Sequence, residues 1–248
     1  MKRVALVTGG GAGIGKVCSR ALLEAGFLVV VCGRHQETLD STIAESDDPD
    51  SMLGVACDVS SEQQVDNLFK SIMDKFGRID VVFNNAGNNV TPMTIDELSV
   101  DQWRTVVDVN LHGAFLIARA AFREMRGQSP QGGRIINNGS ISAHAPRPGS
   151  VPYTTSKHAI TGLTRTISLD GRPFNIACGQ IDIGNAASAM TEKMNSGVPQ
   201  ADGSMKAEPT VDPQHIADAV VHMSALPLDV NVQFMTIMAT TMPYIGRG

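Results

Sequence analysis

Short apolar runs rich in valine and isoleucine alternate along the chain with stretches that have the period of an amphipathic helix. This alternation is typical of βαβ units, in which each helix crosses back over a parallel sheet. The first unit predicts a strand over residues 4–8, a helix over 13–25, and a second strand over 27–32 that is apolar on both faces. We therefore expect an α/β fold with a doubly wound parallel sheet of about seven strands and helices on both faces.

The same periodicity predicts the elements that follow. Ser60 and Gln63 have the spacing of a capping box that opens a helix, and residues 101–126 are expected to form a long helix. Residues 88–100 and 184–211 break the rhythm and are expected to be loops, the second of them a substrate loop or lid. Further strands are expected at residues 81–84, 134–137, 175–178 and 232–238.

Length and charge restrict the class of partner. A chain of 248 residues can form one large α/β domain, and this is the organisation expected for residues 1–248. The formal net charge of −5 and the pI near 5.6, without a long run of lysine and arginine, argue against a nucleic-acid or anionic-membrane surface. The expected partner is a small molecule.

The start of the chain has too short an apolar run for a signal peptide, and no uninterrupted stretch elsewhere is expected to span a bilayer. We therefore expect a cytoplasmic protein. Cys18, Cys32, Cys57 and Cys178 lie far apart without CxxC spacing, so they are expected to be reduced packing residues. Neither a zinc site nor a disulfide framework is indicated.

A glycine-rich segment, TGGGAGIG at residues 8–15, lies between the first expected strand and the first expected helix. At this place in a βαβ unit, a tight turn brings backbone N–H groups against a diphosphate. An ordinary turn is the alternative, but the flanking elements favour cofactor binding. The residues expected to hold the dinucleotide here are Gly9, Gly11, Ala12, Gly13, Ile14 and Gly15.

The end of the second strand bears on which dinucleotide is bound. An acidic side chain there favours NAD, whereas a basic one accommodates the 2′-phosphate of NADP. Arg34 stands at this place without a carboxylate beside it, so NADP(H) is preferred, and NAD(H) stays possible if Arg34 only points to solvent. After the third strand, Asp58 and its neighbour Val59 are expected to border the adenine, although Asp58 could equally cap a helix.

Three motifs follow one another in the chain: TGGGAGIG, then NNAG at residues 84–87, then YTTSK at residues 153–157. In this order they resemble the short-chain dehydrogenase/reductase family, and the resemblance covers residues 4–180. It implies a Rossmann-type NAD(P)-dependent oxidoreductase acting on a carbonyl or an alcohol, and a homo-oligomer, either a tetramer or a dimer. It also implies cofactor contacts from Asn85, Ala86 and Gly87.

The resemblance assigns a role to four side chains. Tyr153 is the acid/base residue, Ser140 holds the substrate oxygen, and Asn110 helps Lys157 to hold a water that leads protons to solvent. Ser142 is a rival to Ser140, but the family spacing of thirteen positions before the tyrosine favours Ser140. Metal ligands are not part of the pattern.

The residues also support this chemistry directly. Tyr153 and Lys157 stand four apart on an expected helix and therefore share one face. A phenol with a pKa of about 10 needs roughly 4 kcal/mol of help to titrate near pH 7. A cation at about 4 Å supplies that much at an effective dielectric of about 20, but only about 1 kcal/mol in bulk water. Lys157 is therefore expected to make the phenol more acidic in a site that excludes water.

The segment after the sixth strand departs from the family. Cys178 stands where the family usually has proline. Ile183 stands near the position at which the family usually has a threonine that contacts the nicotinamide. That contact is expected to be lost or to be made by backbone atoms of Ile181. The following segment has no cluster of arginine or lysine, which favours a neutral substrate.

Two other functions are compatible with the sequence. The first is an NAD(H)-dependent alcohol dehydrogenase, and the second is an NADP(H)-binding sensor or scaffold without turnover. The four side chains argue against the sensor, because a binding module does not need all of them.

Overall fold

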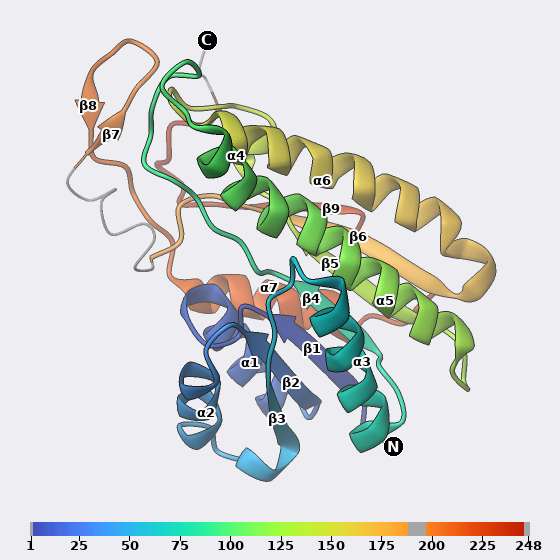
Figure 1. Ribbon diagram of the computed structural model, residues 1–248. Helices are drawn as coiled ribbons and strands as arrows, with labels where there is room; N and C mark the ends of the chain where they lie inside the picture. Colours follow the sequence, from blue (N-terminus) through green and yellow to red (C-terminus); the bar gives the residue numbers. More distant parts are fainter. Residues whose placement is uncertain (1, 188–196, 246–248) are drawn as a thin grey trace.

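Seven parallel strands form the central sheet of the computed structural model, which describes residues 2–187 and 197–245 (Figure 1). The strand order is β3-β2-β1-β4-β5-β6-β9, so the chain winds outward in opposite directions from the boundary between β1 and β4. This confirms the doubly wound α/β fold. The strands are β1 (Val4–Thr8), β2 (Leu28–Gly33), β3 (Met52–Ala56), β4 (Val81–Asn84), β5 (Gly133–Asn138), β6 (Ile176–Ile183) and β9 (Phe234–Ile237).

Helices cover both faces of the sheet, as Figure 1 shows. One layer consists of α1 (Gly13–Glu24), α2 (Gln36–Ala44) and α7 (Pro213–Ala225). The other layer consists of α3 (Glu62–Phe76), α4 (Val100–Val107), α5 (Ala114–Gly127) and α6 (Val151–Asp170). Short 3₁₀ turns lie at Pro49–Ser51, Ile141–Ala143 and Arg172–Phe174, and β7 (Val198–Pro199) pairs with β8 (Met205–Lys206) in a separate ribbon.

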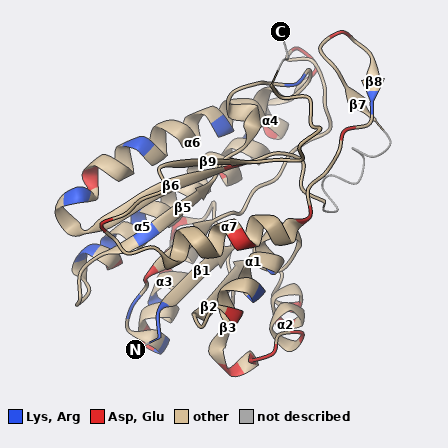
Figure 2. Cartoon of the chain, turned by 180° about the vertical axis from the view of Figure 1, so that it is seen from behind, with Lys and Arg blue, Asp and Glu red and all other residues tan. Residues whose placement is uncertain are grey.

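Two apolar clusters hold the helical layers to the sheet. On β1, Val4 and Leu6 face the cluster under α3 and α5, whereas Ala5 and Val7 face the cluster under α1 and α7. All five β1 residues are buried because side chains alternate between two covered faces. Charged residues of both signs occur on the helices of both layers (Figure 2).

The long helix expected over residues 101–126 is present as one continuous run, Val100–Gly127. It contains a π-helical turn, Asp108–Gly113, between α4 and α5. By length and composition alone this run could cross a membrane, contrary to the expectation from the sequence, and half of its most apolar window is buried inside the protein. In the fold, α5 packs against α3, and α4 packs against α6.

Two local predictions are wrong. The capping box at Ser60 does not form: α3 begins after Ser61, and Asp58 Oδ1 instead accepts both the N–H and the hydroxyl of Ser60. The sixth strand, expected over residues 175–178, begins at Ile176 and continues to Ile183 because it pairs with β5 on one side and β9 on the other.

The two irregular segments have different outcomes. Residues 88–99 contain no helix or strand, as expected for a loop. Within the segment 184–211, the described residues include the β7–β8 ribbon and a bridge between Ala186 and Val211. Residues 188–196 of the expected lid lie outside the described part of the chain.

Candidate active site

A pocket of about 460 Å³ lies at the carboxyl ends of β1, β2, β4 and β5. This is where ligands bind in open α/β sheets, at the point where the strand order reverses. The pocket brings together most of the residues expected to bind a cofactor. Those that line it are Gly9, Gly11, Ala12, Gly13, Ile14, Gly15, Arg34, Asp58, Val59, Asn85, Ala86, Gly87, Tyr153 and Lys157.

The glycine-rich turn has a conformation that side chains would prevent. Gly9 and Gly13 have positive φ angles of 68° and 49°. A Cβ on Gly15 would lie 2.2 Å from the Gly9 carbonyl oxygen, so the turn packs directly on the first turn of α1. The N-cap residue of α1 is Ala12, and within the described part of the chain no side-chain hydrogen bond caps this helix. Its first N–H groups are therefore available to a ligand in the pocket.

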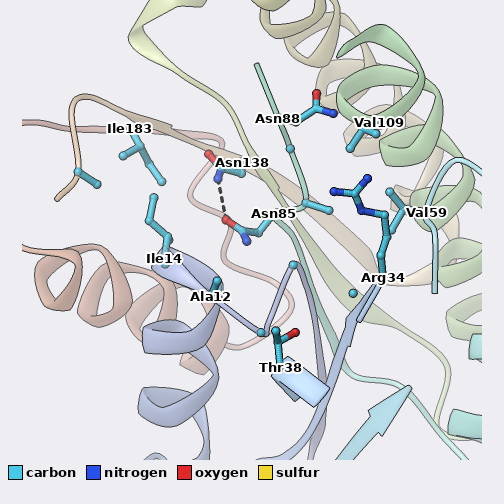
Figure 3. A pocket seen from close by; sticks show the side chains of 18 of the residues that line it. Ala12, Ile14, Arg34, Thr38, Val59, Asn85, Asn88, Val109, Asn138 and Ile183 are labelled. Atoms are coloured by element: carbon cyan, nitrogen blue, oxygen red, sulfur yellow. Dashed lines mark hydrogen bonds between the residues drawn. The ribbon is translucent and has the colours of Figure 1, made fainter. Parts of the chain in front are cut away.

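Thr8 fastens the NNAG segment to the end of β1. Its hydroxyl accepts hydrogen bonds from the Asn85 N–H at 2.9 Å and the Ala86 N–H at 2.8 Å. The Asn85 amide donates to the Thr8 carbonyl, and the Asn138 amide donates to Asn85 Oδ1 (Figure 3). The ends of three neighbouring strands are thus held together. Sequence reasoning did not assign this role to Thr8, although it is the first residue of the motif.

Arg34 and Asp58 lie at the opposite side of the pocket from α6. Figure 3 shows the Arg34 side chain extending from the end of β2 toward Val59 and Val109. The pKa of Asp58 is lowered, mainly by the Ser60 hydroxyl and in smaller part by the charge of Arg34. Asp58 therefore borders the pocket and orders the turn before α3. It is not the capping residue of that helix, because the N-cap is Ser61.

Tyr153 and Lys157 line the other end of the pocket, whereas Ser140 is buried and does not line it. Lys157 Nζ lies 5.6 Å from the centre of the Tyr153 ring, so both side chains project from the same face of α6. The ammonium group donates to the Asn138 carbonyl at 2.7 Å. The Ser140 hydroxyl lies near enough to the Tyr153 phenol to lower its pKa. Ser142 supports this arrangement, because its N–H donates to Ser140 Oγ at 3.1 Å.

The pKa values of Tyr153 and Lys157 differ from the expectation. Burial raises the pKa of Tyr153 above its ordinary value, and Ser140 and the charge of Arg147 offset only part of that effect. Burial also lowers the pKa of Lys157 to about 8. The prediction that Lys157 makes the phenol acidic is thus not met in the protein alone, because desolvation disfavours the charged form of both groups.

Asn110 is buried in the π-helical turn and is bound to the loop after β4. Its Oδ1 accepts from the Asn88 N–H at 2.8 Å, and its Nδ2 donates to the Asn88 carbonyl at 2.9 Å. A longer contact of 3.4 Å joins Nδ2 to the hydroxyl of Ser156, which neighbours Lys157 in the chain. Asn110 therefore connects α6 with the wall of the pocket.

A model of the short chain dehydrogenase family matches residues 3–199. The chain belongs to this family. The match confirms the resemblance that the three motifs indicate, and the protein is an oxidoreductase.

Relatives and solved structures agree with the family match. An uncharacterized oxidoreductase from Staphylococcus epidermidis is 30% identical over 236 residues, covering 95% of this chain and 96% of that protein. A 3β-hydroxysteroid dehydrogenase from Mediterraneibacter gnavus is 32% identical over 198 residues, covering 79% of this chain and 71% of that protein. The structure of levodione reductase matches with a TM-score of 0.83 and 26% identity, over 95% of this chain and 96% of that chain.

This short-chain dehydrogenase differs from the expectation at the end of β6. Ile181 does not line the pocket: it is buried in the core, and its carbonyl accepts the Gly139 N–H at 2.9 Å. Because the strand continues to Ile183, Cys178 lies inside it and does not occupy the turn that follows. Ile183, Gly184 and Ala186 line the pocket instead, and Figure 3 shows Ile183 facing Ile14.

Other lining residues of the dehydrogenase were not expected from the sequence. These residues do not belong to a recognised motif. They follow the ends of strands or lie next to motif residues, so the predicted ends of the strands could have identified them. They are Gly33, His35, Thr38, Cys57, Asn88, Val109, Asn138, Gly139, Ile183, Gly184 and Ala186.

Proposed function

We propose that the protein is an NADP(H)-dependent oxidoreductase that reduces the carbonyl of a small, neutral substrate or oxidises the corresponding secondary alcohol. One observation carries the proposal: the pocket lined by the glycine-rich turn is also lined by Tyr153 and Lys157. A dinucleotide held on the turn would share this pocket with the Tyr153 phenol, which can donate a proton.

The pocket fits a nicotinamide dinucleotide. Gly9 and Gly13 have the positive φ angles that shape the turn, and the uncapped N-terminus of α1 offers N–H donors to a diphosphate. Asn88 Oδ1 is buried without a hydrogen-bond partner among the described residues, although Asn88 lines the same pocket. When bound, such a cofactor supplies or accepts the hydride.

The side chains favour the direction of reduction. Because burial raises the pKa of Tyr153, the phenol keeps its proton at neutral pH and can donate it to a carbonyl oxygen. Ser140 donates a hydrogen bond to the same oxygen and positions it for attack. Lys157, with a pKa of about 8, is mostly protonated at neutral pH and stabilises the phenolate left after the proton has moved.

The names of two similar proteins fit this reaction type, since one is a 3β-hydroxysteroid dehydrogenase and the other a levodione reductase. We extend only the interconversion of carbonyl and alcohol to this chain. The described part of the segment 184–211 borders the pocket through Gly184 and Ala186, so we propose that this segment contributes to substrate selection.

A screen of neutral ketones and aldehydes with NADPH and NADH, followed by cofactor absorbance, tests the proposal. We expect turnover of at least one ketone, with NADPH preferred. Cofactor binding without turnover of any carbonyl or alcohol would support the sensor. A preference for NADH would support the NAD(H)-dependent alcohol dehydrogenase.

Arg34→Ala is expected to weaken NADPH binding about tenfold or more and to leave NADH binding within about twofold. The reason is that a guanidinium pairs with the 2′-phosphate through charge-assisted hydrogen bonds, which are worth about 1.5–3 kcal/mol each. Fluorescence titration of the two cofactors measures the difference. Arg104→Ala, which removes an exposed arginine from α4, is the matched control. Unchanged NADPH affinity in Arg34→Ala would contradict the role of Arg34.

A further inference from the structure

A buried carboxylate lies beside the proposed catalytic residues, at a position that neither the motifs nor the chemistry above uses. Asp182 is on β6, and only 1% of its surface is exposed. Its Oδ1 accepts from the Ser140 N–H at 3.0 Å and from the Gln180 side-chain amide at 2.7 Å. The Nε2 of His144 lies 3.0 Å from Oδ2, within hydrogen-bond distance. Both oxygens of Asp182 therefore have partners.

The surrounding residues are shaped to hold this carboxylate. A Cβ on Gly139 would lie 2.0 Å from Asp182 Oδ1, so only glycine permits the carboxylate to approach the end of β5. Gln180 is itself held by the hydroxyl of Thr164, which donates to Gln180 Oε1 at 3.0 Å. Its Nε2 also donates to the hydroxyl of Thr161 at 3.2 Å. The position of Asp182 is thus fixed from both β5 and α6.

The carboxylate also acts on Lys157 across the end of the sheet. Burial lowers the pKa of Lys157, and the charge of Asp182 opposes that effect. The other titratable groups around the pair are Tyr153 on α6, and His144 and Arg147 on the segment before it, the latter paired with Glu208. Among these groups, Asp182 is the negative charge that acts on Lys157 in the described part of the chain.

We propose that Asp182 is a positioning residue of the active site, which holds Ser140 and His144 by hydrogen bonds. Ser140 is two residues along the chain from Asn138, whose carbonyl accepts from Lys157, so Asp182 places a negative charge near that ammonium group. The role of Asp182 in catalysis rests on the proposed function. Its hydrogen bonds and its effect on Lys157 concern the protein without substrate or cofactor. It gives a role to the segment after Cys178, in which the sequence departs from its family.

The test titrates Lys157 in the full chain without cofactor, by NMR with isotope-labelled lysine and with the signal assigned by its loss in Lys157→Met. The wild type is expected to titrate with a midpoint of about 8. In Asp182→Asn the midpoint is expected to fall by about one pH unit, because a neighbouring opposite charge is lost. His144→Gln keeps an N–H donor for Asp182 and leaves the carboxylate charge, so its midpoint is expected to stay within about 0.3 pH units of the wild type.

Asp80→Asn is the matched control. Asp80 also accepts a backbone N–H, that of Val4, and is paired with Arg78. It stands before β4, at the opposite end of that strand from the pocket, so a purely structural loss should not move the Lys157 midpoint. An unchanged midpoint in folded Asp182→Asn would overturn the proposal. So would an equal fall in Asp80→Asn.

Two further measurements test the role of Asp182, one on the aspartate itself and one on the pH dependence of turnover. If Asp182→Asn does not fold, NMR of the wild type with labelled aspartate replaces it, and a protonated Asp182 carboxyl at neutral pH overturns the proposal. With a substrate in hand, the alkaline limb of kcat/KM in Asp182→Asn should move by about one pH unit toward lower pH. If the wild type turns over no substrate, the proposed function fails while the Lys157 titration still decides the role of Asp182.

Discussion

Tyr153→Phe is expected to lose at least about a hundredfold in turnover while it binds the cofactor with nearly unchanged affinity. The phenol hydroxyl is the group proposed to give a proton to the substrate oxygen, and Tyr153 lines the pocket beside Lys157. The ring itself remains in the variant, so the packing around α6 and the contact with Lys157 are largely preserved. The measurements are kcat with a substrate from the carbonyl screen and a fluorescence titration with NADPH.

Thr155→Val is the control for this variant. It also removes a hydroxyl from the first turns of α6, but Thr155 is exposed, and it is expected to keep full activity. Turnover of Tyr153→Phe within about threefold of the wild type would rule out the proton-transfer role, because positioned acid/base groups contribute about 10²–10⁴.

Gly15→Ala is expected to weaken cofactor binding by at least about tenfold and to destabilise the fold by about 1–3 kcal/mol. The new methyl group would lie 2.2 Å from the Gly9 carbonyl oxygen and 2.8 Å from the Asn85 side-chain amide, so the turn and the NNAG segment must both move. Thermal unfolding with and without NADPH measures both effects. A bound cofactor should raise the Tm of the wild type and raise that of the variant much less.

Gly162→Ala is the matched control within the same protein. Gly162 is exposed on α6, and a Cβ built there would lie more than 4 Å from every described residue apart from its chain neighbours and the backbone of its own helix. Alanine in a helix interior is favoured over glycine by about 0.5–1 kcal/mol, so this variant should be slightly more stable and bind cofactor normally. Wild-type cofactor affinity in Gly15→Ala would contradict the role of the turn.

Much of the fold could be predicted because each strand and helix carries its own pattern. β1 and β4 have the predicted bounds, since short apolar runs that end in polar motif residues mark a buried strand on both sides. The end of β6 could not be predicted in this way. Residues 179–183 are held in the sheet by pairing with β9 and β5, and no local pattern contains that information.

The candidate site, like the fold, could be predicted only in part from the sequence. The spacing of Tyr153 and Lys157 was enough to place both on one face of a helix, because an α-helix repeats every 3.6 residues. Whether the phenol becomes more or less acidic depended on burial, and the sequence led to the wrong direction. The homo-oligomeric assembly and the cytoplasmic location stay predictions from the sequence.

By itself, the sequence determined the family, the order of the motifs, the glycine turn and the pairing of Tyr153 with Lys157. These features depend on residues close together in the chain, where backbone geometry fixes distances. Only the tertiary structure decided that Ile183 and not Ile181 faces the pocket, and that Asp182 meets Ser140 and His144. Those contacts depend on strand register and on exclusion of water, which arise only when segments distant in the sequence pack together.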